Sequence, residues 1–117
     1  MGNRIVVVED EALIVLDIEE AVLGAGCEVV GYAKTIAEAH DVLDTVSCDG
    51  VILDANLNGE SVRPVAERLK AANVPYMVVS GYSREQLDFL DESAVLVAKP
   101  FNFEQLTASI RNMVASG

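Results

Sequence analysis

The 117-residue sequence has no tryptophan, only two cysteines, and no long hydrophobic run. Cys27 and Cys48 lie far apart without CxxC spacing, so we expect reduced, partly buried thiols in a cytoplasmic protein. No apolar stretch approaches the roughly 18 residues of a candidate membrane span. The amino terminus enters a strand-like run almost at once, without the shape of a signal peptide. The sequence therefore indicates neither a disulfide framework nor a membrane partner.

Cationic side chains are also scarce. Eight Lys and Arg residues stand against nineteen Asp and Glu residues, which gives a formal net charge of -11 at pH 7. Such a surface repels phosphate backbones and disfavours direct binding of nucleic acid. We expect most of the acidic residues to lie on solvated helix faces and a few to form a metal site.

Apolar residues, in contrast, are plentiful. They make up 51% of the chain, and charged residues make up 23%. This composition provides enough apolar area to offset chain entropy, so the chain is not expected to be disordered. Its length suits a single core without a second module, and we expect one domain over residues 1–117.

The apolar pattern alternates between short strands and amphipathic helices. Strands are expected at residues 4–8, 28–33, 50–53, 76–79 and 94–98. Helices are expected at residues 12–25, 36–46, 61–72, 83–90 and from 103 onward, with capping signals at Thr35, Ser83 and Asn102 and a left-handed stop at Asn73. Short connections between these elements predict an α/β fold, a doubly wound parallel sheet with helices on both faces.

Chemically active side chains recur where the expected strands end. Glu9 and Asp10 follow the first strand, Asp54 the third, Ser80 the fourth and Lys99 the fifth. The carboxyl ends of parallel strands meet at one edge, which is where open α/β sheets place their active sites. Any one of these residues alone is more typical of a turn, a cap or the surface. Their joint placement is what predicts a site.

Three acids at one edge repel one another, and a hard divalent cation removes that conflict. Oxygen ligands with room for water suit Mg²⁺, and the backbone carbonyl of Asn56 could turn toward the same ion. Ser80 and Lys99 could each contact an oxygen of an incoming phosphoryl group. Phosphoryl transfer needs a nucleophile and groups that stabilise charge on the phosphoryl oxygens. Asp54 could act as the nucleophile beside Mg²⁺, and the Ser80 hydroxyl and Lys99 could stabilise the charge.

With these residues in place, the chain resembles the receiver domain of two-component response regulators along essentially its whole length. The resemblance rests on Glu9-Asp10, Asp54, Ser80 and Lys99-Pro100-Phe101, in the family's order and spacing. It implies a five-stranded sheet of order 2-1-3-4-5 and Mg²⁺ held by Asp10, Asp54 and the Asn56 carbonyl, with Glu9 acting through water. It further implies that a histidine kinase or histidine phosphotransfer protein donates the phosphoryl group to Asp54.

Three features depart from the common family pattern. Leu96 stands where the family usually has a switch aromatic, Asn58-Gly59 replaces Pro-Gly, and the short stretch from Ser80 to Lys99 predicts a shortened fourth helix. Together with Ser-Gly-Tyr82, these features are similar to the subgroup with a Phe-Ala-Thr-Gly-Tyr-type motif, in which the hydroxyl-aromatic coupling is altered. Tyr82 could overhang the acceptor aspartate and slow the access of water, or it could contact a partner.

The sequence thus predicts a stand-alone receiver of a two-component system or phosphorelay. It would catalyse its own phosphorylation and dephosphorylation and signal by protein–protein contact or phosphotransfer. One alternative is a pseudo-receiver that binds partners constitutively, although the acids, Ser80 and Lys99 are intact. Another is a Mg²⁺-dependent aspartyl-phosphate phosphatase, but such enzymes need an acid-base Asp where this chain has Asn56.

Overall fold

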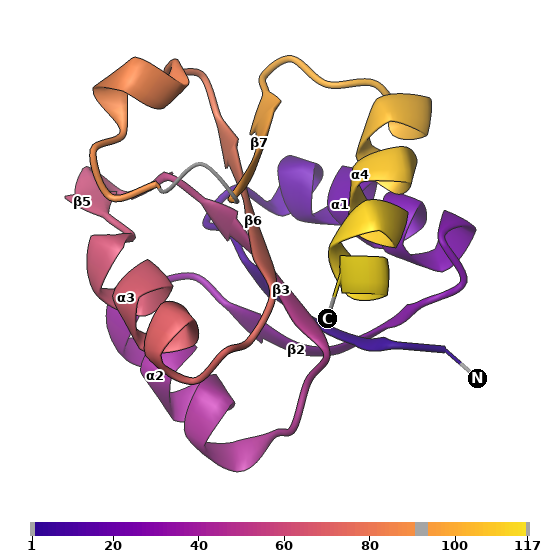
Figure 1. The fold of residues 1–117 in the computed structure, drawn as a ribbon, viewed down its shortest axis with the longest axis horizontal. Helices are drawn as coiled ribbons and strands as arrows, with labels where there is room; N and C mark the ends of the chain where they lie inside the picture. Colours follow the sequence, from indigo (N-terminus) through magenta and orange to yellow (C-terminus); the bar gives the residue numbers. More distant parts are fainter. Residues whose placement is uncertain (1, 91–93, 117) are drawn as a thin grey trace.

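The computed structural model describes residues 2–90 and 94–116 and contains a five-stranded parallel sheet (Figure 1). The strands are β1 (Arg4–Val8), β2 (Glu28–Ala33), β3 (Gly50–Asp54), β6 (Tyr76–Ser80) and β7 (Val95–Ala98). Their spatial order is β2-β1-β3-β6-β7, and every neighbouring pair is parallel. Numbered within the sheet, this is the order 2-1-3-4-5, so the predicted fold class is confirmed.

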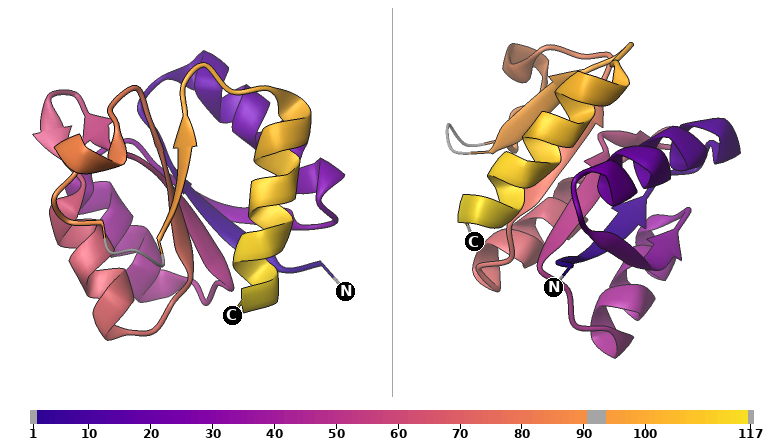
Figure 2. Two further views of the ribbon diagram at one scale, coloured as in Figure 1. Left: turned by 45° about the horizontal axis from the view of Figure 1, so that its top comes forward. Right: turned by 90° about the vertical axis from the view of Figure 1, so that its right-hand side faces the viewer.

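Helices cover both faces of this sheet. Helices α1 (Ala12–Gly24) and α4 (Phe103–Ser116) lie on one face, and α2 (Ile36–Thr45) and α3 (Arg63–Ala71) on the other (Figures 1 and 2). Strand β1 shows the consequence: Ile5 and Val7 join the core of the α1/α4 face, and Val6 and Val8 join that of the α2/α3 face. An unbroken β-branched run, as in residues 5–8, is typical of a strand buried on both faces.

Local sequence signals set several helix ends. The side chain of Thr35 accepts a hydrogen bond from the Glu38 N–H at 3.0 Å, and Asn102 caps α4 by accepting from the Gln105 N–H at 2.7 Å. These contacts satisfy amide groups that have no partner within the helix. Asn73 follows α3 with a φ of 57°, the predicted left-handed stop.

The structure corrects the prediction for the segment after β3. No strand was expected between residues 53 and 61, but residues 56–61 form a hairpin of β4 (Asn56–Leu57) and β5 (Glu60–Ser61). Its turn consists of Asn58 and Gly59, both with positive φ, and an Asn-Gly pair favours this turn. Leu57 is only 2% exposed and fixes the hairpin to the core. Helix α3 consequently begins at Arg63, later than predicted.

A shortened fourth helix is confirmed, but its predicted extent of residues 83–90 is wrong. Only one 3₁₀ turn, η1 (Arg84–Gln86), forms between β6 and β7 in the described residues. Leu87 and Phe89, which follow this turn, are both buried. Burial of these two side chains takes the place of a regular helix in the segment.

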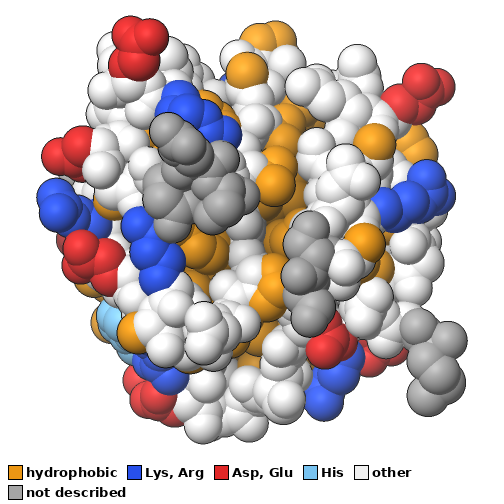
Figure 3. All heavy atoms as spheres, viewed as in Figure 1, with side chains coloured by type: hydrophobic (Ala, Val, Ile, Leu, Met, Phe, Trp, Pro, Cys, Tyr) orange, Lys and Arg blue, Asp and Glu red, His pale blue; other side chains and the backbone are white. Residues whose placement is uncertain are grey.

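Cationic side chains hold the segment around η1. Lys70 of α3 donates to the Phe89 carbonyl at 2.5 Å, and Arg84 donates to the Ala94 carbonyl at 2.7 Å. Figure 3 shows Lys and Arg side chains over α3 and η1, interspersed with Asp and Glu side chains. The segment is therefore held by side chain–backbone contacts rather than by a helical ladder.

Both cysteines have free thiols: Cys27 is buried and Cys48 is half-buried. Burial raises the pKa of the Cys48 thiol, which disfavours its reactive thiolate form. Within the described residues, no helix is both long and apolar enough to span a membrane.

Candidate functional site

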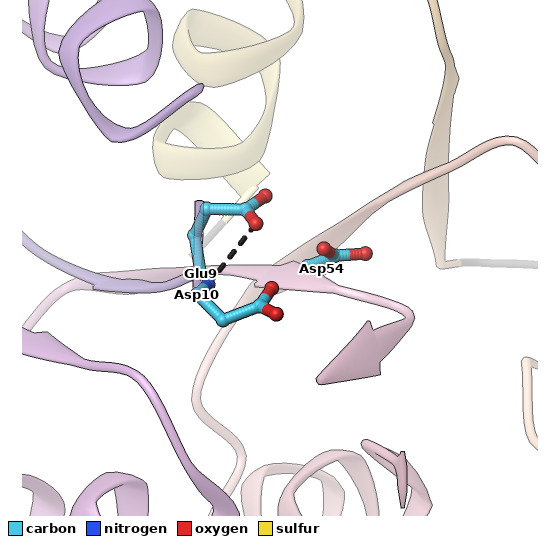
Figure 4. A group of neighbouring side chains, drawn as sticks. All are labelled: Glu9, Asp10 and Asp54. Carbon is cyan, nitrogen blue, oxygen red and sulfur yellow. Dashed lines mark hydrogen bonds between the residues drawn. The ribbon is translucent and has the colours of Figure 1, made fainter. Parts of the chain in front are cut away.

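Three carboxyl groups meet at the carboxyl edge of the sheet (Figure 4). Glu9 and Asp10 directly follow β1, and Asp54 is the last residue of the neighbouring strand β3. One oxygen from each residue lies within 4.8 Å of the others. The parallel pairing of β1 with β3 is what brings these distant parts of the chain together.

Asp54 is 6% exposed and lies between two donors. Its Oδ1 accepts a hydrogen bond from the Asn56 N–H at 3.2 Å, and its Oδ2 accepts one from Lys99 Nζ at 3.3 Å. Lys99 follows the edge strand β7, and its Nζ also lies 3.7 Å from Glu9 Oε1. One ammonium group thus bridges an acid of β1 and an acid of β3.

Glu9 is the most deeply placed acid, at 1% exposed. Its Oε2 accepts hydrogen bonds from the N–H groups of Asp10 (Figure 4) and Glu11, at 3.0 and 3.1 Å. Its Oε1 is buried without a hydrogen bond. Burial, followed by the neighbouring Asp54 carboxyl, raises the pKa of Glu9 to about 8. Without a further positive charge, Glu9 therefore holds its proton at neutral pH.

Asp10 and Asn56 lie nearer the surface. Asp10 is half-buried, and its Oδ2 accepts a hydrogen bond from the Asn58 N–H at 3.3 Å. Asn56 opens β4 and is exposed, and its side-chain Oδ1 accepts from the Gly59 N–H at 2.8 Å. Sequence reasoning missed the contact between the hairpin and Asp10. The Asn-Gly turn signature was the available signal.

Ser80 ends β6, next to the residue that pairs with Asp54 in the sheet. It is 1% exposed, and its Oγ accepts a hydrogen bond from the Tyr82 N–H at 2.8 Å. The Lys99 N–H donates to the Ser80 carbonyl at 2.8 Å, which ties the two strand ends together. The hydroxyl and the ammonium group therefore come from neighbouring strands at the same edge.

Tyr82 is half exposed and lines an open cavity beside the site. The cavity has a volume of about 370 Å³, and its walls are Ala55, Asn56, Ser61, Tyr82, Gln86, Leu87, Asp88 and Phe89. Two of these residues immediately follow Asp54, so the ring lies close to the segment after β3. Leu96, in contrast, packs against the core of the α2/α3 face.

The donor set fits a hard divalent cation. Three carboxyl groups face one ammonium group, which leaves an excess of negative charge when all are ionised. One buried oxygen, Glu9 Oε1, lacks a hydrogen-bond donor. Carboxylate oxygens in a partly open site are ligands that suit Mg²⁺, so the cluster could hold such an ion.

Comparison with known proteins decides the family. The model of the response regulator receiver domain matches residues 5–111. The chain belongs to this family. The phyllosphere-induced regulator PhyR of Methylorubrum extorquens is 36% identical over 114 residues, a match that covers 94% of this chain and 43% of that protein. The chain spans about half the length of the curated relatives it matches.

Solved structures agree with this assignment. The response regulator PhyR from Brucella abortus is 31% identical with a TM-score of 0.86, and the match covers 99% of this chain and 49% of that one. SdrG from Sphingomonas melonis Fr1 is 30% identical with a TM-score of 0.78, and the match covers 97% of both chains. The receiver fold is therefore shared with proteins both longer than and similar in length to this one.

Proposed function

We propose that this receiver accepts a phosphoryl group on Asp54 in a Mg²⁺-dependent reaction, with a histidine kinase or a histidine phosphotransfer protein as donor. One observation carries the proposal. The buried Asp54 carboxylate contacts the Lys99 ammonium at 3.3 Å and shares its site with Glu9 and Asp10. A nucleophile, a fixed positive charge and a hard-cation ligand set are thus combined within a few ångströms.

The chemistry assigns each residue a task. A carboxylate oxygen of Asp54 attacks phosphorus, the bond from phosphorus to the donor imidazole breaks, and the imidazole leaves as the acyl phosphate forms. Lys99 and the Ser80 hydroxyl stabilise the phosphoryl oxygens, whose charge rises in the transition state. Bound Mg²⁺ would neutralise further charge on these oxygens. Asp10, Asp54 and the Asn56 carbonyl would hold it directly, with Glu9 acting through water.

The output would pass through the segment after β6. In the unphosphorylated protein the Ser80 Oγ accepts the Tyr82 N–H. If the hydroxyl turns toward a phosphoryl group, this bond is lost and residues 81–90 must rearrange. The signal would then leave by contact with a downstream protein or by onward phosphotransfer.

Intact-protein mass spectrometry tests the proposal. The protein is incubated with acetyl phosphate, with and without Mg²⁺, beside Asp54→Asn and the control Asp17→Asn, which changes an exposed acid of α1. We expect one phosphoryl adduct on the wild type and on Asp17→Asn with Mg²⁺, and none on Asp54→Asn. Absence of an adduct on the wild type would support a pseudo-receiver. Rapid consumption of donor without an adduct would support a phosphatase.

A further inference from the structure

The β4–β5 hairpin is a fixed element beside the acid cluster. Leu57 on β4 is buried in the core, and the Val62 N–H donates to the Ala55 carbonyl at 3.1 Å across the root of the hairpin. The turn residues Asn58 and Gly59 have φ values of 51° and 86°. Because the hairpin is fastened at its root and by Leu57, its turn has a defined position.

Two amide groups of this hairpin donate to the acids of two different strands. The Asn56 N–H donates to Asp54 Oδ1 at 3.2 Å, and the Asn58 N–H donates to Asp10 Oδ2 at 3.3 Å. The two donors stand two positions apart in the chain, one at the start of β4 and one in the turn that follows it. A hydrogen bond from the Gly59 N–H to Asn56 Oδ1 further stabilises the turn that carries these two amide groups.

We propose that the Asn58-Gly59 turn positions Asp10 as a metal ligand. The Asn58 N–H holds one oxygen of the half-exposed Asp10 carboxylate and leaves the second oxygen available to a cation. Hydrogen bonds to ligating carboxylates orient them, and loss of such a partner weakens metal affinity. The inference deepens the proposed function and rests on the Mg²⁺ site that it assumes.

Asn73 provides a matched control position. It is exposed, like Asn58, and has a similar left-handed φ of 57°, but it lies at the end of α3. Valine is strained at such φ values because its branched side chain crowds the backbone. Asn58→Val and Asn73→Val therefore introduce the same kind of strain, one in the hairpin and one outside it. Both Asn58→Val and Asn58→Gly keep the backbone amide, but glycine adopts the positive φ without strain and so keeps the turn that orients this amide.

The experiment measures the Mg²⁺ dissociation constant of each full chain by calorimetry, and its thermal unfolding midpoint without Mg²⁺. We expect both valine variants to unfold at lower temperature than the wild type. Asn58→Val should bind Mg²⁺ about 10-fold more weakly. Asn73→Val and Asn58→Gly should match the wild type within about twofold, the spread expected for independent sites. If Asn58→Val does not fold, the less strained Asn58→Ala takes its place.

The outcomes separate the two proposals. Equal Mg²⁺ affinity in Asn58→Val and Asn73→Val would overturn the positioning role of the turn and leave phosphorylation of Asp54 standing. A wild-type chain that binds no Mg²⁺ would overturn the metal site itself, and the positioning role with it. Mg²⁺ binding that is weaker in Asn58→Val, but unchanged in Asn73→Val and Asn58→Gly, would support the role of the turn.

Discussion

At the scale of single residues, Glu9 lies in an environment that differs strongly from that of a surface acid. Its carboxyl group is buried and accepts two backbone hydrogen bonds through one oxygen, and the other oxygen lies 3.7 Å from the Lys99 ammonium. Desolvation outweighs these favourable contacts, which is why its pKa rises to about 8. A cation bound beside Glu9 would favour the ionised carboxylate and lower this pKa.

This raised pKa predicts how stability depends on pH without Mg²⁺. Between about pH 4.5, the ordinary pKa, and pH 8, the folded chain keeps a proton on Glu9 that the unfolded chain loses. The free energy of unfolding should therefore decrease as pH rises through this window. Urea unfolding in EDTA from pH 5 to pH 8 should show a steeper decrease for the wild type than for Glu9→Gln, which carries no titrating proton. Parallel pH profiles would show that Glu9 does not hold the proton.

At the scale of elements, the segment between β6 and β7 combines a weak secondary structure with specific anchors. One 3₁₀ turn, two buried apolar side chains and the donors Lys70 and Arg84 hold it. Such a segment can change its hydrogen bonds without unfolding a helix, so we expect it to rearrange at lower cost than the regular helices and strands. It begins at the Ser80–Tyr82 hydrogen bond, at the same sheet edge as the acid cluster.

We therefore predict that phosphorylation rearranges residues 80–90 while Leu96 keeps its position. Gly81 allows the backbone to rearrange, and Leu96 has neither a ring to swing nor a hydroxyl to rebond. We expect the change to reach about Asp91, a residue that lies outside the described part of the chain. Backbone NMR with and without a phosphate mimic should show the largest shifts around Tyr82. Large shifts confined to β7, with a silent Tyr82 loop, would contradict the prediction.

At the scale of the whole molecule, the main feature is the large net negative charge, which affects the stability of the fold. A net charge of -11 on 117 residues produces self-repulsion that favours the unfolded chain at low ionic strength. Any salt screens this repulsion, so stabilisation by MgCl₂ alone does not demonstrate a site. A bound ion adds stability by mass action, because the unfolded chain lacks the site.

The unfolding midpoint should therefore increase more with MgCl₂ than with NaCl at matched ionic strength. Asp10→Ala should keep the response to NaCl and lose the additional response to Mg²⁺, while its stability without metal stays the same or increases because one repelling charge is gone. Differential scanning calorimetry on both proteins measures this. An identical Mg²⁺ response in wild type and Asp10→Ala would show that Asp10 is not a ligand.

The sequence by itself determined the order of strands and helices and the residues at the strand ends. Apolar periodicity and capping side chains are local, so Thr35, Asn73 and Asn102 could be interpreted without knowing their neighbours in space. The ends of parallel strands meet at one edge, so Glu9, Asp10 and Asp54 could be grouped before any distance was known.

The tertiary structure alone decided how these elements are held. Residues 56–61 look like a polar loop apart from the Asn-Gly turn signal, and burial of Leu57 in the core is what fixes them as a hairpin. The segment at residues 83–90 has a capping box, but Leu87 and Phe89 are buried, and Lys70 rather than a helical amide binds the Phe89 carbonyl. The raised pKa of Glu9 likewise follows from burial beneath distant segments. These features depend on contacts between residues far apart in sequence, which local periodicity does not encode.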